Sequence, residues 1–164
     1  MDVENYCVVD LPEGASYMAL SYVWGRTHFT KLTGSNMASL HTPGGLRNVA
    51  LPQTIMDTLS LVKLLEEKYL FVDCLCIVQD DEEDQMKQIK QMGGIYWLAD
   101  LTIVAAGHGD VHTGLPGFRH GSRNAEQYSE DVDGLKLVTV ALPLETQLRN
   151  LTWHSRAWTY QEFL

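Results

Sequence analysis

The sequence predicts one α/β domain, with an open, mainly parallel β-sheet flanked by helices. The chain has 164 residues, the length of a single domain. Apolar runs typical of buried strands alternate along it with segments of helical periodicity. No internal repeat or low-complexity segment interrupts this alternation, and such alternation favours a parallel sheet.

Four segments are predicted to be strands. Residues 17–24 form an apolar and aromatic run that ends at a glycine. Residues 69–77 and 101–106 are continuous apolar runs, which are typical of strands covered on both faces. Residues 135–141 alternate well enough for a fourth strand, which Pro143 stops.

Helices are predicted between these strands. Pro52 suits a first helical turn, and it precedes an apolar stripe made of Ile55, Met56, Leu59, Val62 and Leu65. Asp80 or Asp81 can cap the next helix, in which Gly93-Gly94 permits close packing or a bend. The buried stripe expected there is Met86, Ile89, Met92 and Tyr96. A short helix to Leu151 is expected to lead into the terminal segment.

Two long loops are predicted, over residues 26–48 and 107–134, and long loops in compact domains often bind ligands. The second is rich in Gly, His and polar residues, which makes it a poor candidate for packed structure and a good one for a lid over a cleft. Ligands of an open parallel sheet bind beyond the carboxyl ends of its strands. The segments expected there are Trp24-Gly25-Arg26, Gln79-Asp80 and Gly107-His108.

The net charge and the cysteine content of the chain argue against several classes of function. The chain has 12 Lys+Arg against 21 Asp+Glu, and the net charge of -9 argues against nucleic-acid and anionic-membrane partners. Its three cysteines are an odd number without a disulfide framework, and neither a signal peptide nor a membrane span is apparent. A reducing, cytoplasmic setting fits best.

Metal and thiol chemistry are weakly supported alternatives. Cys74, Cys76, His108 and His112 are ligand types that zinc accepts, but their spacing matches no known zinc pattern, so no metal site is predicted. Strand alternation would send Cys74 and Cys76 to one buried face, where a nucleophilic thiolate is disfavoured.

Asp73 is the anomaly inside the apolar run 69–77. A buried carboxylate needs hydrogen-bond partners or a countercharge, because burying it unpaired costs several kcal/mol. Asp73 therefore either braces a site from below or has a purely structural role.

The segment from Trp153 to Leu164 has the pattern of a site. Glu162 follows Trp158 by four positions, so the indole and the carboxylate share one helical face, while Arg156 lies off that stripe. The alternative is structural, since tryptophans near a terminus often plug a core and a neighbouring acid can simply reach solvent.

Five motifs, read together, resemble the fungal heterokaryon incompatibility (HET) domain over about residues 17–164. They are Ala19-Leu-Ser-Tyr-Val-Trp-Gly25, Leu51-Pro-Gln-Thr-Ile-Met-Asp57, Val72-Asp-Cys-Leu-Cys-Ile-Val-Gln79, Met92-Gly-Gly-Ile-Tyr96 with Ala99, and Arg156-Ala-Trp-Thr-Tyr-Gln-Glu162. Val78 stands where the family often has Asn, and Ala157 where it often has Gly.

The resemblance implies a cell-death effector domain that acts in nonself recognition and belongs to a longer protein with receptor or regulatory domains. HET domains look like distant relatives of TIR domains, which implies a flavodoxin-like, three-layer fold. The segment from Trp158 to Glu162 matches the Trp-Cys-x-x-Glu spacing in which enzymatic TIR domains keep a catalytic glutamate, with Thr159 in place of the cysteine.

The implied substrate is NAD, and no separate cofactor is expected. Breaking its nicotinamide–ribose bond makes the ribose oxocarbenium-like, and a carboxylate can stabilise that developing charge. The expected catalytic residue is Glu162, and the expected substrate-binding residues are Ser21, Tyr22, Trp24, Gly25, Arg26, Asp73, Gln79, Arg156 and Trp158. Trp24 or Trp158 could stack on a base, and Arg26 could meet the pyrophosphate.

The competing hypothesis is a noncatalytic module that associates with itself or with a signalling partner, as many TIR-like domains do. Fold alone does not exclude it. The resemblance also implies a homo-oligomer on activation, so inactivity in dilute solution would not decide between the two.

Overall fold

The computed structural model describes residues 1–107, 109–122 and 128–140, together with the single positions 143, 146, 151 and 153. At its centre is a parallel sheet in the order β2-β1-β3, made of β1 (Met18–Tyr22), β2 (Leu70–Phe71) and β3 (Leu101–Ala105). β1 pairs with β3 from Met18↔Leu101 to Tyr22↔Ala105, so both strands end at one edge. The predicted α/β class with a parallel sheet is confirmed.

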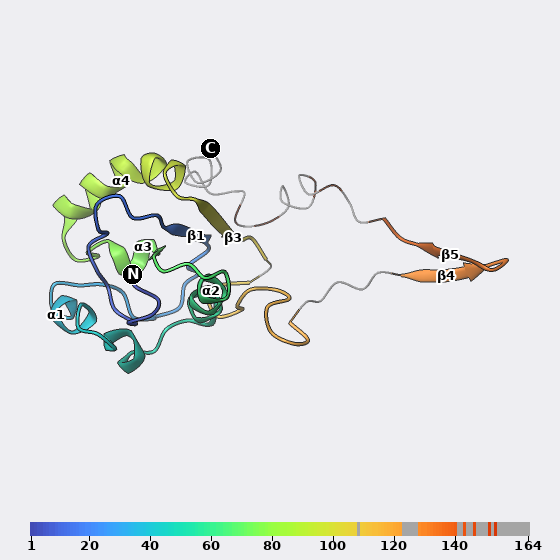
Figure 1. Ribbon diagram of the computed structural model, residues 1–164, viewed down its shortest axis with the longest axis horizontal. Coiled ribbons are helices and arrows are strands. Elements are labelled where there is room, and N and C mark those ends of the chain that lie inside the picture. The colour runs from blue at the N-terminus through green and yellow to red at the C-terminus, as the bar shows by residue number, and fades with distance from the viewer. Residues whose placement is uncertain are drawn as a thin grey trace.

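Helices α2 (Gln53–Leu64) and α4 (Glu82–Trp97) cover opposite faces of the sheet (Figure 1). Side chains alternate across β1, so Leu20 and Tyr22 pack on the α2 side and Ala19 packs against α4. The predicted α2 stripe is confirmed for Ile55, Leu59 and Val62, which are all buried. It is wrong for Met56 and Leu65, which are exposed.

Helix α4 begins as predicted. The Asp81 side chain accepts hydrogen bonds from the backbone N–H groups of Glu83 and Asp84, both at 3.0 Å, which caps the helix. Met92 and Tyr96 are buried, but the predicted burial of Met86 is wrong, because its side chain is 55% exposed. Met86 lies six positions from Met92, which is about 120° around the helix.

The Gly93-Gly94 pair lies inside α4, which continues unbroken through it. Glycine inside a helix costs about 1 kcal/mol relative to alanine. A Cβ atom added at either position would have no neighbour within 4 Å. Neither glycine is therefore needed for packing within the described chain.

The predicted strand 69–77 is only partly a strand. β2 covers its start, and the short helix α3 (Asp73–Cys76) follows. Cys74 is buried in the α2-side core and Cys76 is half-buried against it, but both residues lie in α3, so the prediction that they share one face of a strand is wrong. Periodicity cannot distinguish a buried strand from a buried helical turn in a short apolar run.

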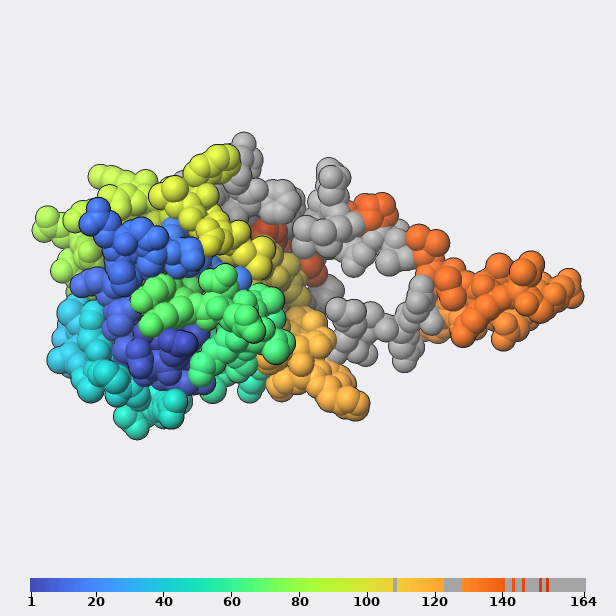
Figure 2. Space-filling model, in the orientation of Figure 1, coloured from blue at the N-terminus to red at the C-terminus, as the bar shows by residue number. Residues whose placement is uncertain are grey.

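The predicted fourth strand belongs to a separate hairpin. β5 (Leu135–Val138) pairs antiparallel with β4 (Ser129–Val132), and the two strands do not join the central sheet. Asp133 and Gly134 connect them with φ values of 51° and 80°, as in the tight turns that favour hairpins. The hairpin stands away from the sheet (Figures 1 and 2), and all residues of both strands are exposed.

Two loops contain more structure than predicted. The stretch 26–48 includes α1 (Met37–Leu40) and the 3-10 helix η1 (Gly45–Asn48). The stretch 107–134 includes β4, and its residues Val111 and Leu115 are buried, so the expectation that it packs poorly is wrong there. None of the helices in the described part of the chain has the length and apolar character needed to cross a bilayer.

Candidate functional site

The loops after β1 and β3 meet at the carboxyl edge of the sheet. Gly25 has a φ of 74°, and a Cβ atom added there would lie 2.6 Å from Cβ of Asp110. Only glycine combines this left-handed conformation with such close contact. Gly25 therefore lets the loop containing Trp24 approach the loop that contains Asp110.

Trp24 and Asp73 form the polar centre of this edge. The Trp24 indole N–H donates to both carboxylate oxygens of Asp73, at 3.1 and 3.0 Å. Asp73 also accepts from the backbone N–H of Cys74 at 2.7 Å, one of the donors that a helix start leaves free. These donors satisfy the anomalous carboxylate that the sequence places within an apolar run.

Lys31 and Phe29 surround the Trp24 ring. The Lys31 ammonium lies 4.2 Å from the ring centroid, within the range of a cation–π contact. Phe29 meets the indole edge to face, with ring centroids 6.1 Å apart. The half-buried indole is thus held by the cation, by Phe29 and by its packing against the α2-side core.

Gln79 forms hydrogen bonds to the backbone of Asp73 and of Ile77, next to Trp24 and Asp73. Its side-chain amide donates to the backbone carbonyls of Asp73 and Ile77, at 3.3 and 2.9 Å. The amide of Gln85, from α4, donates in turn to the Gln79 side-chain oxygen at 3.2 Å. The structure therefore brings together Trp24, Asp73 and Gln79, which the sequence analysis selected from separate segments.

Ser21 connects the sheet to the distal part of the chain. The Trp153 indole N–H donates to the Ser21 hydroxyl at 2.6 Å. Ser21 is fully buried and Trp153 is 2% exposed, so water does not compete for this bond. Trp153 therefore lies beside the carboxyl end of β1.

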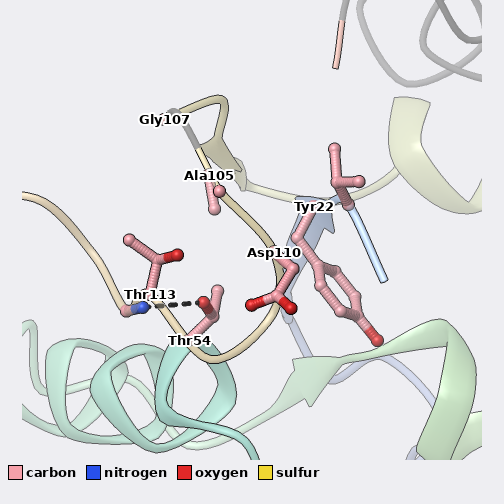
Figure 3. A pocket seen from close by; sticks show the side chains of 9 residues that line it. Tyr22, Thr54, Ala105, Gly107, Asp110 and Thr113 are labelled. Atoms are coloured by element: carbon pink, nitrogen blue, oxygen red, sulfur yellow. Dashed lines mark hydrogen bonds between the residues drawn. The ribbon is translucent and has the colours of Figure 1, made fainter. Parts of the chain in front are cut away.

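Tyr22 lines a small pocket between the two loops (Figure 3). The pocket has a volume of about 10 Å³, enough for one water molecule. Burial, followed by the negative charge of Asp73, raises the pKa of Tyr22 well above its ordinary value. The same two causes raise the pKa of the buried Cys74 thiol, which makes it a poor nucleophile.

Several predicted site residues contribute little to this geometry or cannot be placed in it. Arg26 is exposed on the loop after β1. Arg156, Trp158, Glu162 and His108 lie outside the described residues, so their predicted roles stay predictions. Within the described ranges, no three His, Cys, Asp or Glu side chains gather closely enough to hold a metal ion.

Asp57 is a buried anchor that the sequence analysis did not select. Its side chain is 3% exposed and accepts from the Leu115 backbone N–H at 2.9 Å and the Arg119 Nε–H at 3.1 Å. The Gln53 amide donates to its other oxygen at 2.7 Å. An acid on the buried side of an otherwise apolar helix was the signal that could have identified it.

Two further hydrogen bonds, both made by Thr54, join α2 to the segment 109–122. The Gly114 backbone N–H donates to the Thr54 hydroxyl at 3.1 Å, the bond drawn in Figure 3, and the Thr54 N–H donates to the Val111 carbonyl at 3.0 Å. Gly114 has a φ of 83°, and a Cβ atom there would lie 2.4 Å from an Asp57 oxygen. The segment 109–122 is therefore tied down on the first turns of α2.

The order of motifs along this architecture matches one protein family. Residues 17–162 match the family model described as heterokaryon incompatibility protein (HET). The chain belongs to the HET family. Its HET region starts just before β1 and includes both site loops, the Asp57 anchor and, as its last residue, Glu162.

A named HET relative agrees with this assignment. Over 99 residues the chain is 35% identical to heterokaryon incompatibility protein 6, OR allele, of Neurospora crassa. The alignment covers 56% of this chain and 14% of that protein. No solved structure matches the chain significantly.

Proposed function

We propose that this HET chain is a cell-death effector domain of fungal nonself recognition and acts as an NAD+ glycohydrolase that cleaves the nicotinamide–ribose bond. Family membership and the name of the Neurospora relative support the biological role. The hydrogen bond between Trp153 and Ser21 carries the enzymatic part. It brings the start of the terminal segment to the sheet edge where Trp24 and Asp73 lie, and Glu162 follows nine positions later.

Glu162 is assigned the catalytic role. As the bond between ribose C1′ and the nicotinamide nitrogen breaks, its electron pair stays with nicotinamide, which leaves as a neutral molecule. The Glu162 carboxylate stabilises the positive charge that develops on the ribose. Water then adds to C1′ and releases a proton, so the products are ADP-ribose and nicotinamide.

The described residues are assigned to substrate binding. Trp24 is assigned to stacking on a base, since Asp73 fixes the indole edge and Lys31 lies over one face. Arg26 is exposed on the same loop, where it meets the pyrophosphate. The other residues assigned to substrate binding are Gly25, Gln79, Arg156 and Trp158, with the buried Ser21 and Tyr22 supporting the loop that contains Trp24.

The pocket between the loops after β1 and β3 is small. The pocket lined by Tyr22 and Asp110 holds about 10 Å³, whereas ligand sites of larger molecules occupy about 300–1,000 Å³. That pocket is therefore too small for NAD, which would instead lie against the neighbouring loop that contains Trp24 and the exposed Arg26.

The test is nicotinamide release from NAD by concentrated purified protein, measured by chromatography. Glu162→Gln keeps the size of the side chain and removes its charge, and it is expected to lower the rate by about a hundredfold or more. Glu130→Gln, on the exposed hairpin, is the matched control and should leave the rate unchanged. Equal rates for the wild type and Glu162→Gln would remove Glu162 from the mechanism.

A noncatalytic self-association module is the second candidate. An exposed apolar patch on α4 favours it. This module predicts that NAD stays intact at every protein concentration, also after chemical cross-linking. It further predicts that Glu162→Gln still causes cell death when expressed in a fungal host.

A further inference from the structure

The outward face of α4 carries an apolar patch that the sequence analysis expected to be partly buried. The patch, here called the α4 patch, consists of Met86, Lys90, Gly93, Gly94 and Trp97. Trp97 is 73% exposed and Met86 is 55% exposed. These residues recur every three or four positions, so they lie along one side of the helix, about 120° around it from the buried Met92 and Tyr96.

The composition of the α4 patch is that of a protein-binding surface. Tryptophan and methionine are enriched in protein interfaces, and an exposed tryptophan is a frequent energetic centre of such surfaces. α4 runs along the outside of the molecule, where its atoms form part of the surface (Figures 1 and 2). The patch is therefore accessible to a second protein.

Gly93 and Gly94 have no side chains, and the gap that they leave in the α4 patch is here called the notch. Gly93 and Gly94 weaken the helix, and a Cβ atom at either position would meet nothing within 4 Å. The distance between packed helices depends on the side chains at their contact, so two glycines allow a second helix to approach closely. Their positions between Lys90 and Trp97 put this notch in the middle of the patch.

We propose that two copies of this chain associate through the α4 patch, with the two α4 helices packed antiparallel around Gly93 and Gly94. A two-fold interface must be complementary to itself. With the crossing between the two glycines, Lys90 of each copy faces Trp97 of the other, because the two residues are equally distant from the crossing. A lysine ammonium over an indole is a favourable contact.

The charge distribution along α4 selects this orientation. Glu82, Glu83 and Asp84 lie in the first turn, and Asp81 caps it, whereas Lys87 and Lys90 lie near the middle. A parallel pair would place the two acidic ends side by side. An antiparallel pair separates them by the length of a sixteen-residue helix, about 24 Å, and also opposes the two helix dipoles.

This inference names the surface for the self-association that the second candidate function invokes, and it does not depend on NAD cleavage. It is tested on the 164-residue chain by sedimentation velocity from low micromolar to submillimolar concentration. The expected result is a reversible monomer–dimer equilibrium, which Trp97→Gln shifts by raising the dissociation constant at least about tenfold. Leu64→Gln is the matched control, because Leu64 is also 73% exposed but lies on α2, and it should leave the equilibrium unchanged.

Gly94→Gln separates an interface effect from misfolding. Glutamine is a better helix former than glycine and has open space around it here, so the variant should raise the urea midpoint of the dilute monomer. The same side chain fills the notch, so the dimer dissociation constant should rise at least about tenfold. A wild-type chain that stays monomeric throughout, or a dimer that tolerates both Trp97→Gln and Gly94→Gln, overturns the proposal. A loss of dimer with Leu64→Gln equal to that with Trp97→Gln overturns it as well.

Discussion

Asp57 and Asp73 are two carboxylates near the starts of helices that face the same sheet edge, yet their surroundings differ. Asp57 is 3% exposed and accepts from Gln53, Leu115 and Arg119, so it ties the segment 109–122 to α2. Asp73 is half-buried and holds the single indole N–H of Trp24 between its two oxygens. The first carboxylate is enclosed by its own chain, and the second lies where a ligand could reach its neighbours.

The difference in burial indicates that Asp57 stabilises the fold, whereas Asp73 shapes the candidate site. A carboxylate whose acceptor capacity is used by buried backbone groups contributes mainly to stability. A half-buried carboxylate that orients an aromatic ring at a loop contributes more to the shape of a surface. Substitutions at the two positions should therefore have different consequences, which the following experiments measure.

The largest effect is expected for Asp57→Ala. It leaves the buried Leu115 N–H without an acceptor and removes the Arg119 ion pair, which together should cost about 2–4 kcal/mol of unfolding free energy. Arg119 is about half exposed, so water can solvate its freed charge and limits the loss. Urea unfolding measures the change, and Asp57→Asn, which keeps one oxygen acceptor, should recover part of it.

A smaller effect is expected for Asp73→Ala, about 1–2 kcal/mol, because this carboxylate is only half-buried. The Trp24 indole N–H should also exchange faster with solvent, which nuclear magnetic resonance can follow. Asp80→Ala is the control, since Asp80 accepts one backbone N–H from Gly34 at an exposed position and its loss should cost less. If Asp73→Ala destabilised the protein as much as Asp57→Ala, the contrast between the two carboxylates would be wrong.

Lys31→Met tests the cation over Trp24. The substitution keeps most of the aliphatic chain and removes the ammonium 4.2 Å from the ring, so the loss should be about 0.5–1 kcal/mol. A matched exposed lysine, Lys87→Met, should change the unfolding free energy less. Equal changes for the two variants would show that the contact adds nothing.

The smallest effect at neutral pH, and one that grows with pH, concerns Tyr22. Its pKa and that of Cys74 are raised in the folded protein, from ordinary values of 10.0 and 9.0. The unfolded chain then loses these protons first as the pH rises above about 9, so stability present at neutral pH falls by about 1.4 kcal/mol per pH unit for each group. Tyr22→Phe should make this decline less steep, as urea unfolding at neutral pH and near pH 11 would reveal. An unchanged slope would contradict the assignment.

Much of the framework was predictable because it depends on local patterns. The α2 stripe of Ile55, Leu59 and Val62 and the Asp81 cap follow from helical spacing and from the donors at a helix start. Trp24 and Gln79 could be selected because parallel strands end at one edge, and Asp73 because it is an acid within an apolar run. The role of Glu162 remains a prediction, since the residue lies outside the described part of the chain.

Two of the failures share a cause. The run 69–77 contains both a strand and a helical turn, and Met86 lies too far around α4 from Met92 to share its buried face. Asp57 is buried on α2, although a carboxylate on a helix usually faces solvent. For the run 69–77 and for Asp57, the answer depends on contacts with distant residues, such as Leu115 and Arg119 for Asp57.

The sequence by itself determined the α/β class, the order of most elements and the family, because these depend on periodicity, capping and ordered motifs that local spacing encodes. Only the tertiary structure decided which acid is an anchor, which strand leaves the sheet to form a hairpin, and which apolar face of α4 points to solvent. The physical reason is that burial and hydrogen-bond partnership belong to pairs of distant segments, whereas periodicity belongs to each segment alone.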